Sequence, residues 1–136
     1  MGPLGEVAVG MSAEKSVIIA REMTIGHFVA RMPYVYATPM MILHMEMAAG
    51  AAIVSALPSG FVSVGMEISV RHLAATAISR SVRAIAEVTG IDARSVFFRI
   101  ETWNDERKIG EGTHRRGIVN VREFEERFGA RERALG

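Results

Sequence analysis

A carboxylate stands inside the most apolar stretch of this chain. Glu46 lies in the run MMILHMEMAAGAAIV, where every other residue is uncharged at neutral pH. An ionised carboxylate buried in such surroundings costs several kcal/mol unless it is paired or hydrogen-bonded. Glu46 therefore either reaches water or a basic partner from the edge of its helix, or acts as a base or nucleophile that its surroundings tune.

Two more side chains suit the same chemistry. Thr38 stands before Pro39 at the start of the apolar run, and His72 ends the strand-like segment FVSVGMEISVRH. Thr38 is expected to cap the helix, because its hydroxyl can accept from a free N–H of the first turn. A histidine at the edge of a core commonly bonds a backbone group. For Thr38 a capping role is compatible with a catalytic one, whereas for His72 the structural role is the alternative to catalysis.

Composition excludes several classes of site. The chain has no cysteine, which removes disulfides, thiolate metal sites and cysteine nucleophiles. Sixteen basic and fifteen acidic residues give a net charge of +1, too little for nucleic-acid binding. The other histidines, His27, His44 and His114, have no metal-ligand spacing, so we expect no metal and assign them no role.

The elements that position these residues follow from the apolar pattern. The segment from Thr38 to Pro58 predicts one long helix with proline at its first position, apolar almost all round and therefore buried on most of its surface. Strands are predicted over residues 15–24, 61–72, 80–90, 94–104 and 107–120, with turns at 89–92 and 104–106. Val62, Val64, Met66, Ile68, Val70 and His72 are expected to share one face of their strand.

One strand, a buried helix and four consecutive strands indicate an α+β fold, with an antiparallel sheet wrapped around the helix. Residues 26–37 are expected to form a loop, and VREFEERFGARERALG a short surface helix with a frayed tail. We expect a single domain over residues 1–136, with 1–14 and 130–136 mobile. No secretory leader is recognisable, and the uncharged stretch after Glu46 is too short for a bilayer, so we expect a soluble, cytoplasmic protein.

The segments VYATPMMILHMEMAAG, SVGMEISVRHLAAT and IGEGTHRRGIV resemble the fluoroacetyl-CoA thioesterase-like branch of the hotdog superfamily, over roughly residues 15–120. The resemblance implies a hotdog fold and a catalytic set of Thr38, Glu46 and His72. It also places Gly65 where the thioester is bound, and Arg116 at a late-strand arginine that binds substrate.

The resemblance predicts an acyl-CoA thioesterase that releases free acid and CoA. Val29 and Met32 stand where fluoroacetyl-specific members have gating phenylalanines, which favours a short-chain or aryl acyl group over fluoroacetyl. No cofactor is expected, because CoA is part of the substrate. The alternatives are another hotdog acyl-CoA enzyme, such as a dehydratase, and a non-catalytic acyl-CoA binding module.

We also expect a homodimer, and possible higher homo-oligomers, because a curved sheet around one helix leaves a strand edge and apolar surface uncovered. The strands 61–72 and 94–104 are the candidate edges.

Overall fold

The computed structural model describes residues 2–129. Five antiparallel strands form one sheet, and its order is β1-β3-β4-β5-β2. The strands are β1 (Ser12–Ile18), β2 (Phe61–His72), β3 (Ser81–Asp92), β4 (Ser95–Trp103) and β5 (Lys108–Asn120). The helices are α1 (Ile25–Phe28), α2 (Thr38–Ile53) and α3 (Val121–Phe128), with short 3-10 turns at Arg21–Met23 and Val54–Ala56.

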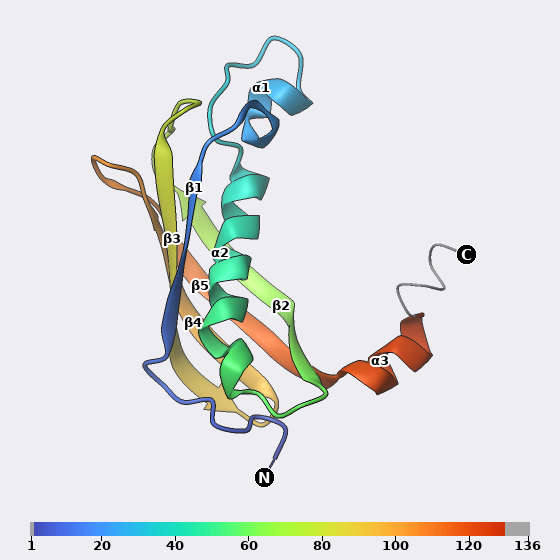
Figure 1. Cartoon of the computed structure of the whole chain (residues 1–136). Helices are drawn as coiled ribbons and strands as arrows, with labels where there is room; N and C mark the ends of the chain where they lie inside the picture. The colour runs from blue at the N-terminus through green and yellow to red at the C-terminus, as the bar shows by residue number, and fades with distance from the viewer. Residues whose placement is uncertain (1, 130–136) are drawn as a thin grey trace.

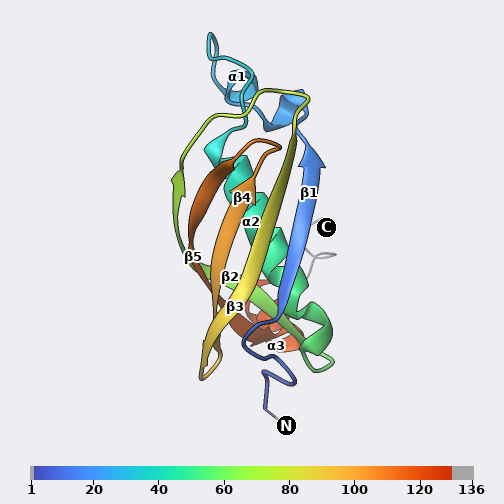
Figure 2. The ribbon, with the colours of Figure 1, turned by 90° about the vertical axis from the view of Figure 1, so that its left-hand side faces the viewer.

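The sheet curls around α2 and leaves α3 projecting beside its end (Figure 1). Turned by 90°, the molecule shows the strands in front and α2 behind them, so the helix occupies the concave face (Figure 2). Met41, Met45 and Ile53 of α2 are fully buried against this face. This is the α+β arrangement expected from the sequence.

Helix α2 is buried on one side instead of on most of its surface. Its inner side carries the fully buried Ala48 and Ala49, whose small side chains allow the helix to lie close to the strands, whereas Leu43, Met47 and the adjoining Val54 are exposed. The stretch Thr38–Ala56 is long and apolar enough to cross a membrane by length and composition. Packing in the core accounts for the apolar inner side of this stretch, while its outer side is apolar and exposed.

The two candidate edges have different positions in the sheet. β2 is an edge strand, paired on one side with β5. β4, which covers the predicted segment 94–104, is central and pairs with both β3 and β5, so the prediction that it forms an edge is wrong. Its alternately buried residues Val96, Phe98 and Ile100 belong to the core, as two-sided pairing allows.

A β-bulge at Met66 changes which side chains of β2 point inward. Gly65 pairs with Arg116 and Glu67 with Arg115, so Met66 has no partner of its own in the ladder. An unpaired residue reverses the alternation of the strand beyond it. Before the bulge the side facing α2 carries Phe61, Ser63 and Gly65, and after it Ile68, Val70 and His72. The predicted shared face is therefore wrong for Val62, Val64 and Met66.

Other boundaries differ by a few residues. The first strand is Ser12–Ile18 instead of 15–24, because the chain turns at Arg21–Met23. The turn predicted at 89–92 lies at residues 93–94, and Gly90 sits at a second bulge within β3. The turn at 104–106 is confirmed, with Asn104 Oδ1 accepting from the amides of Glu106 and Arg107.

The N-terminal segment packs against the fold. Val7 is buried in the core, and the amide of Glu6 donates to the carbonyl of Ala56 after α2. The expected mobile lead-in of residues 1–14 is thus attached over most of its length. The segment 130–136, also expected to be mobile, lies outside the described residues.

Candidate active site

Thr38 and His72 meet at the N-terminal end of α2. Thr38 Oγ1 lies 2.8 Å from His72 Nδ1, so the end of β2 and the start of the helix are joined by a side-chain hydrogen bond. Thr38 is the first residue of the helix, not its cap: the cap is Ala37, and no side chain caps this end. The predicted capping role is therefore wrong, and the hydroxyl is directed to the histidine instead.

The imidazole of His72 is held in partly buried surroundings. Its ring makes an edge-to-face contact with Tyr36, at 6.4 Å between centroids. Burial lowers the pKa of His72, which keeps the ring neutral near pH 7. Its Nε2 atom is buried and has no hydrogen-bond partner among the described residues. A neutral ring with one nitrogen on a hydroxyl can accept and return a proton.

A cavity of about 630 Å³ opens beside this pair. Its lining residues are mostly apolar around the polar Thr38 and His72, and they are Ile25, Val35, Tyr36, Ala37, Thr38, Pro39, His72, Leu73, Ala74 and Ala75. Apolar walls with a few convergent polar groups are typical of a small-molecule site.

Glu46 faces a second group of residues, further along α2. A Cβ atom on Gly65 would lie 2.5 Å from Glu46 Oε2, so the carboxylate rests against the bare backbone of β2. Arg116 Nη1 lies 3.6 Å from the same oxygen, and the Glu46 side chain remains 35% exposed. The basic partner and the access to water that the sequence required of this residue are both present.

The guanidinium of Arg116 is hydrogen-bonded to groups of the protein itself. Its Nε donates to Ser63 Oγ at 2.8 Å, its Nη2 to the Ser63 carbonyl at 3.0 Å, and its side chain is only 11% exposed. The fixed guanidinium supplies a positive charge next to Glu46. This geometry favours a role through Glu46 over the direct substrate contact that the resemblance implies.

The three predicted catalytic residues form two separate groups in one chain. Glu46 comes eight residues after Thr38 on the same helix, which is about 12 Å along its axis. Glu46 lines two other hollows: one of about 500 Å³ with Arg116, and one of about 220 Å³ with Gly65. The structure thus brings Thr38 to His72, and Glu46 to Gly65 and Arg116.

A buried tyrosine-histidine pair beside the site was missed by sequence reasoning. Tyr36 Oη and His44 Nδ1 are hydrogen-bonded, and their rings are stacked with centroids 5.8 Å apart. Burial raises the pKa of Tyr36, and burial together with the charge of Lys15 lowers the pKa of His44. Tyr36 lies in the loop before α2 and His44 within the helix. Helical periodicity therefore cannot predict that the two side chains meet.

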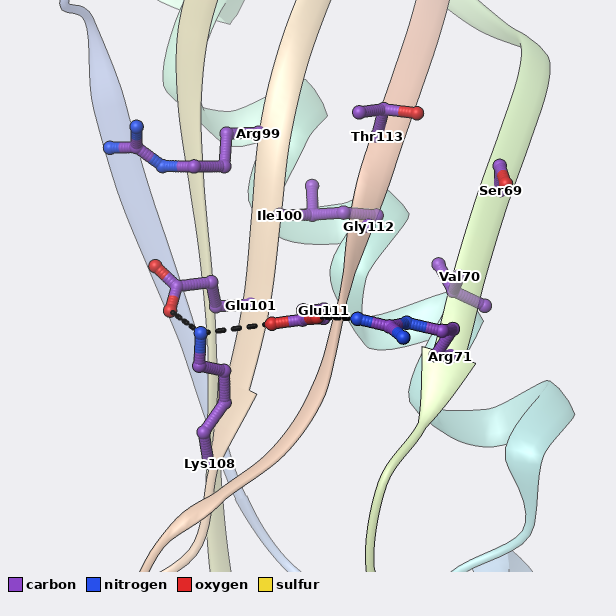
Figure 3. A pocket seen from close by; sticks show the side chains of 10 residues that line it. All are labelled: Ser69, Val70, Arg71, Arg99, Ile100, Glu101, Lys108, Glu111, Gly112 and Thr113. Atoms are coloured by element: carbon purple, nitrogen blue, oxygen red, sulfur yellow. Dashed lines mark hydrogen bonds and ion pairs between the residues drawn. The ribbon is translucent and has the colours of Figure 1, made fainter.

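A hollow on the opposite face of the sheet has a different character. Figure 3 shows Lys108 between two carboxylates with α2 behind the strands; Lys108 Nζ lies 3.3 Å from Glu101 and 3.0 Å from Glu111, and Glu111 also binds Arg71. The side chain of Glu111 holds the pKa of Lys108 above its usual range. These charges satisfy one another across β4, β5 and β2, as cross-strand pairs on an open sheet face do.

Comparison with known proteins decides the family. The profile of the fluoroacetyl-CoA-specific thioesterase family matches residues 19–122. The chain belongs to this family. A fluoroacetyl-CoA thioesterase from Streptantibioticus cattleyicolor is 34% identical over 95 residues, which are 70% of this chain and 68% of that protein. As a member of the fluoroacetyl-CoA-specific thioesterase family, the chain is a thioester hydrolase.

Solved structures support the family and the fold. A fluoroacetyl-CoA thioesterase superimposes with a TM-score of 0.84 at 28% identity, over 89% of this chain and 94% of that one. A Thermus thermophilus protein described as a thioesterase superfamily member gives a TM-score of 0.83 at 28% identity, over 94% and 93% of the two chains. A hot-dog-like protein from Thermanaerovibrio acidaminovorans, 23% identical, has a TM-score of 0.81 over 90% and 94%. The expected hotdog fold is confirmed.

Proposed function

We propose that this thioester hydrolase acts on a short-chain or aryl acyl-CoA, with Thr38, Glu46 and His72 as its catalytic residues. The hydrogen bond between Thr38 and His72 at the mouth of an apolar cavity carries the proposal, because it couples a hydroxyl to a neutral imidazole where an acyl group fits. The 34% identical relative is named for fluoroacetyl-CoA, and a mutant of the solved enzyme was crystallised with acetyl-CoA, which supports an acyl-CoA substrate.

Glu46 supplies the negative charge that this chemistry needs. Either its carboxylate attacks the thioester carbonyl to give a transient anhydride, or it takes a proton from the attacking water. Gly65, which lies against the carboxylate, would bring the thioester close to it. Thr38 orients the carboxylate or the substrate, and His72 assists proton transfer. In the water route it relays the proton that leaves the attacking water to the departing thiolate, and in the anhydride route it takes the proton of the water that later opens the anhydride. The amide of Thr38, which donates to no backbone carbonyl among the described residues, is a candidate donor to the oxyanion.

The separation of the two groups supports a homodimer whose sites combine both chains. Exposed apolar residues lie on the outer side of α2 and along the edge strand β2, namely Leu43, Met47, Val54, Val62 and Met66. A second copy paired antiparallel along β2 would cover them. In a register that sets Gly65 of one chain beside His72 of the partner subunit, Glu46 would meet the second chain's threonine-histidine pair.

Mixed dimers test this arrangement. We would combine Glu46→Gln chains with His72→Ala chains, each inactive alone, under conditions that allow exchange. A shared site predicts recovered turnover, because one site of each mixed dimer then has both intact residues. No recovery in dimers shown by mass to be mixed would place all three residues in one chain. A stable monomer in sedimentation would contradict the dimer itself.

A panel of acyl-CoAs assayed for free thiol tests the reaction. Acetyl-, propionyl-, benzoyl- and phenylacetyl-CoA should release thiol without added metal or cofactor, since we propose that the enzyme uses neither. Hydration of an enoyl-CoA without thiol release would favour a dehydratase, and binding without turnover would favour a carrier. We further propose that the enzyme works in the cytoplasm, where acyl-CoAs are made.

A further inference from the structure

His114 is a buried histidine beside the candidate site with no role so far. It lies on β5 opposite Ile68 of β2 and Phe98 of β4, with 3% of its surface exposed. A Cβ atom on Gly65 would lie 3.5 Å from His114 Cε1, so the imidazole borders the hollow that also holds Glu46. If position 114 served packing alone, an apolar side chain would suffice there, so the imidazole calls for a polar role.

The hydrogen bonds of His114 fix its tautomer. Nδ1 lies 2.8 Å from the carbonyl oxygen of Glu67, which can only accept, so Nδ1 carries the proton. In the neutral ring Nε2 is then an acceptor, and Arg116 Nη1 lies 3.2 Å from it. His114 therefore receives a hydrogen bond from the same guanidinium nitrogen that faces Glu46.

The charges around His114 keep it in this form. Burial lowers its pKa, and the positive charge of Arg116 on its own strand acts in the same direction. The Glu67 carbonyl from β2 and the Glu46 carboxylate from α2 act the other way, and β4 contributes the uncharged Phe98. A proton on Nε2 would face the N–H of Arg116, donor against donor.

We propose that His114 is a positioning residue for Glu46, which it aligns through Arg116. Ser63 holds Nε and Nη2 of the guanidinium, and His114 holds Nη1, the nitrogen that lies 3.6 Å from Glu46 Oε2 and 3.5 Å from the Glu46 carbonyl. Without the acceptor at Nε2, the planar guanidinium is held only along its Nε–Nη2 edge, and it can pivot about that edge so that Nη1 moves away from the carboxylate. The inference rests on the proposed catalytic role of Glu46.

Two amide substitutions separate the two nitrogens of the ring. His114→Gln places an amide oxygen where Nε2 accepts from Arg116, whereas His114→Asn keeps a donor to the Glu67 carbonyl and loses that acceptor. We expect His114→Gln to keep kcat within about threefold, and His114→Asn to lower kcat by ~10- to 100-fold with little change in KM, as for a displaced catalytic group. Thermal unfolding of both variants shows whether they are equally folded.

A double-mutant cycle tests the path through Arg116. In an Arg116→Ala background, His114→Asn should cause no further loss, because the group through which it acts is absent. Folded His114→Asn with wild-type kcat, or equal losses in His114→Gln and His114→Asn, would overturn the inference. Losses that add independently to Arg116→Ala would do the same. Glu46→Gln with wild-type turnover would instead overturn the proposed function, so the two failures are distinguishable.

Discussion

Glu46 of α2 and Gly65 of β2 approach so closely that a single methyl group on Gly65 would touch the Glu46 carboxylate. A Cβ atom there would lie 2.5 Å from Oε2, and its next neighbours, at 3.4 and 3.5 Å, would be in ordinary contact. The obstructed atom is the end of a flexible side chain, which can rotate. Gly65 is therefore required for where Glu46 lies more than for folding.

Gly65→Ala should consequently separate activity from stability. The carboxylate has to leave its position beside Arg116, so we expect kcat to fall on the order of a hundredfold, while the free energy of unfolding changes by about 1 kcal/mol or less. Thiol release and chemical denaturation on one sample measure both. Gly90→Ala is the matched control, since its Cβ would meet Phe97 at 3.8 Å without a clash. Wild-type kcat in Gly65→Ala would show that the carboxylate position does not matter.

Glu46→Gln keeps the volume of the side chain and removes its charge. We expect a folded protein with unchanged assembly mass that loses on the order of a hundredfold or more in kcat while still binding acyl-CoA. The control is Glu67→Gln, which should keep full activity. The Glu67 side chain is 71% exposed, and its carboxylate lies 3.8 Å from Arg115. A folded Glu46→Gln enzyme with near wild-type turnover would remove Glu46 from the mechanism.

Substitution of Thr38 distinguishes a helix-capping role from a catalytic role. A capping hydroxyl would make Thr38→Ala cost about 1 kcal/mol of stability, but here the hydroxyl binds His72 and caps nothing. We expect Thr38→Ala to change the unfolding free energy little and to lower kcat, and Thr38→Ser, which keeps the hydroxyl, to recover most of the rate. Equal activity in both variants would show that the hydroxyl is dispensable.

The loop after α1 predicts the substrate preference. Val29 and Met32 are about half exposed there, at positions where gating phenylalanines are expected in fluoroacetyl-specific members. Without aromatic gates, we expect kcat/KM for fluoroacetyl-CoA to be no more than about tenfold above that for acetyl-CoA, within what a small difference in a pocket supplies. A preference of several orders of magnitude would mean that another part of the loop performs the gating.

Acid should destabilise the fold through its buried histidines. Burial lowers the pKa of His44, His72 and His114 in the folded state, so below the ordinary value of about 6.5 the unfolded chain binds more protons. Stability is then fully present above pH 6.5 and falls as pH drops toward the folded values, by at most ~1.4 kcal/mol per pH unit for each histidine. Denaturation between pH 7.5 and 5 measures the slope, which His44→Leu should make shallower. A flat profile would contradict neutral burial of these rings.

The sequence anticipated the long-range outline better than the local geometry. The range of β2 and the central helix follow from apolar runs between turn residues, and Glu46 stood out because a charge in an apolar helix requires a partner. The resemblance named Arg116 as a substrate-binding residue, but its pairing with Glu46 was not predicted, since a contact across 70 positions leaves no periodic trace. The bulge at Met66 was missed because an extra residue in an apolar strand changes the face without changing the composition.

Thr38 and His114 show why side-chain roles are harder to predict than elements. A threonine before a helical proline fits the cap pattern whether or not its hydroxyl turns to the backbone, and here a histidine 34 residues away is the stronger partner. His114 was set aside because its spacing suits no metal site. Its role depends on which atoms surround the ring, and those come from β2 and β5 together.

The long sequence separation of Arg116 from Glu46 also bears on the order of folding. Gly65 lies in β2, the next strand after α2, but the ladder partner of β2 is β5, so the bare backbone beside Glu46 is held in place only when β5 has joined the sheet. The cation also arrives with β5, because Arg116 lies 70 positions after Glu46 in the chain. Closing such a loop costs entropy before its contacts compensate. During synthesis, a chain that has emerged only as far as β2 therefore carries Glu46 without its counter-charge, and the last strand to be made neutralises the site.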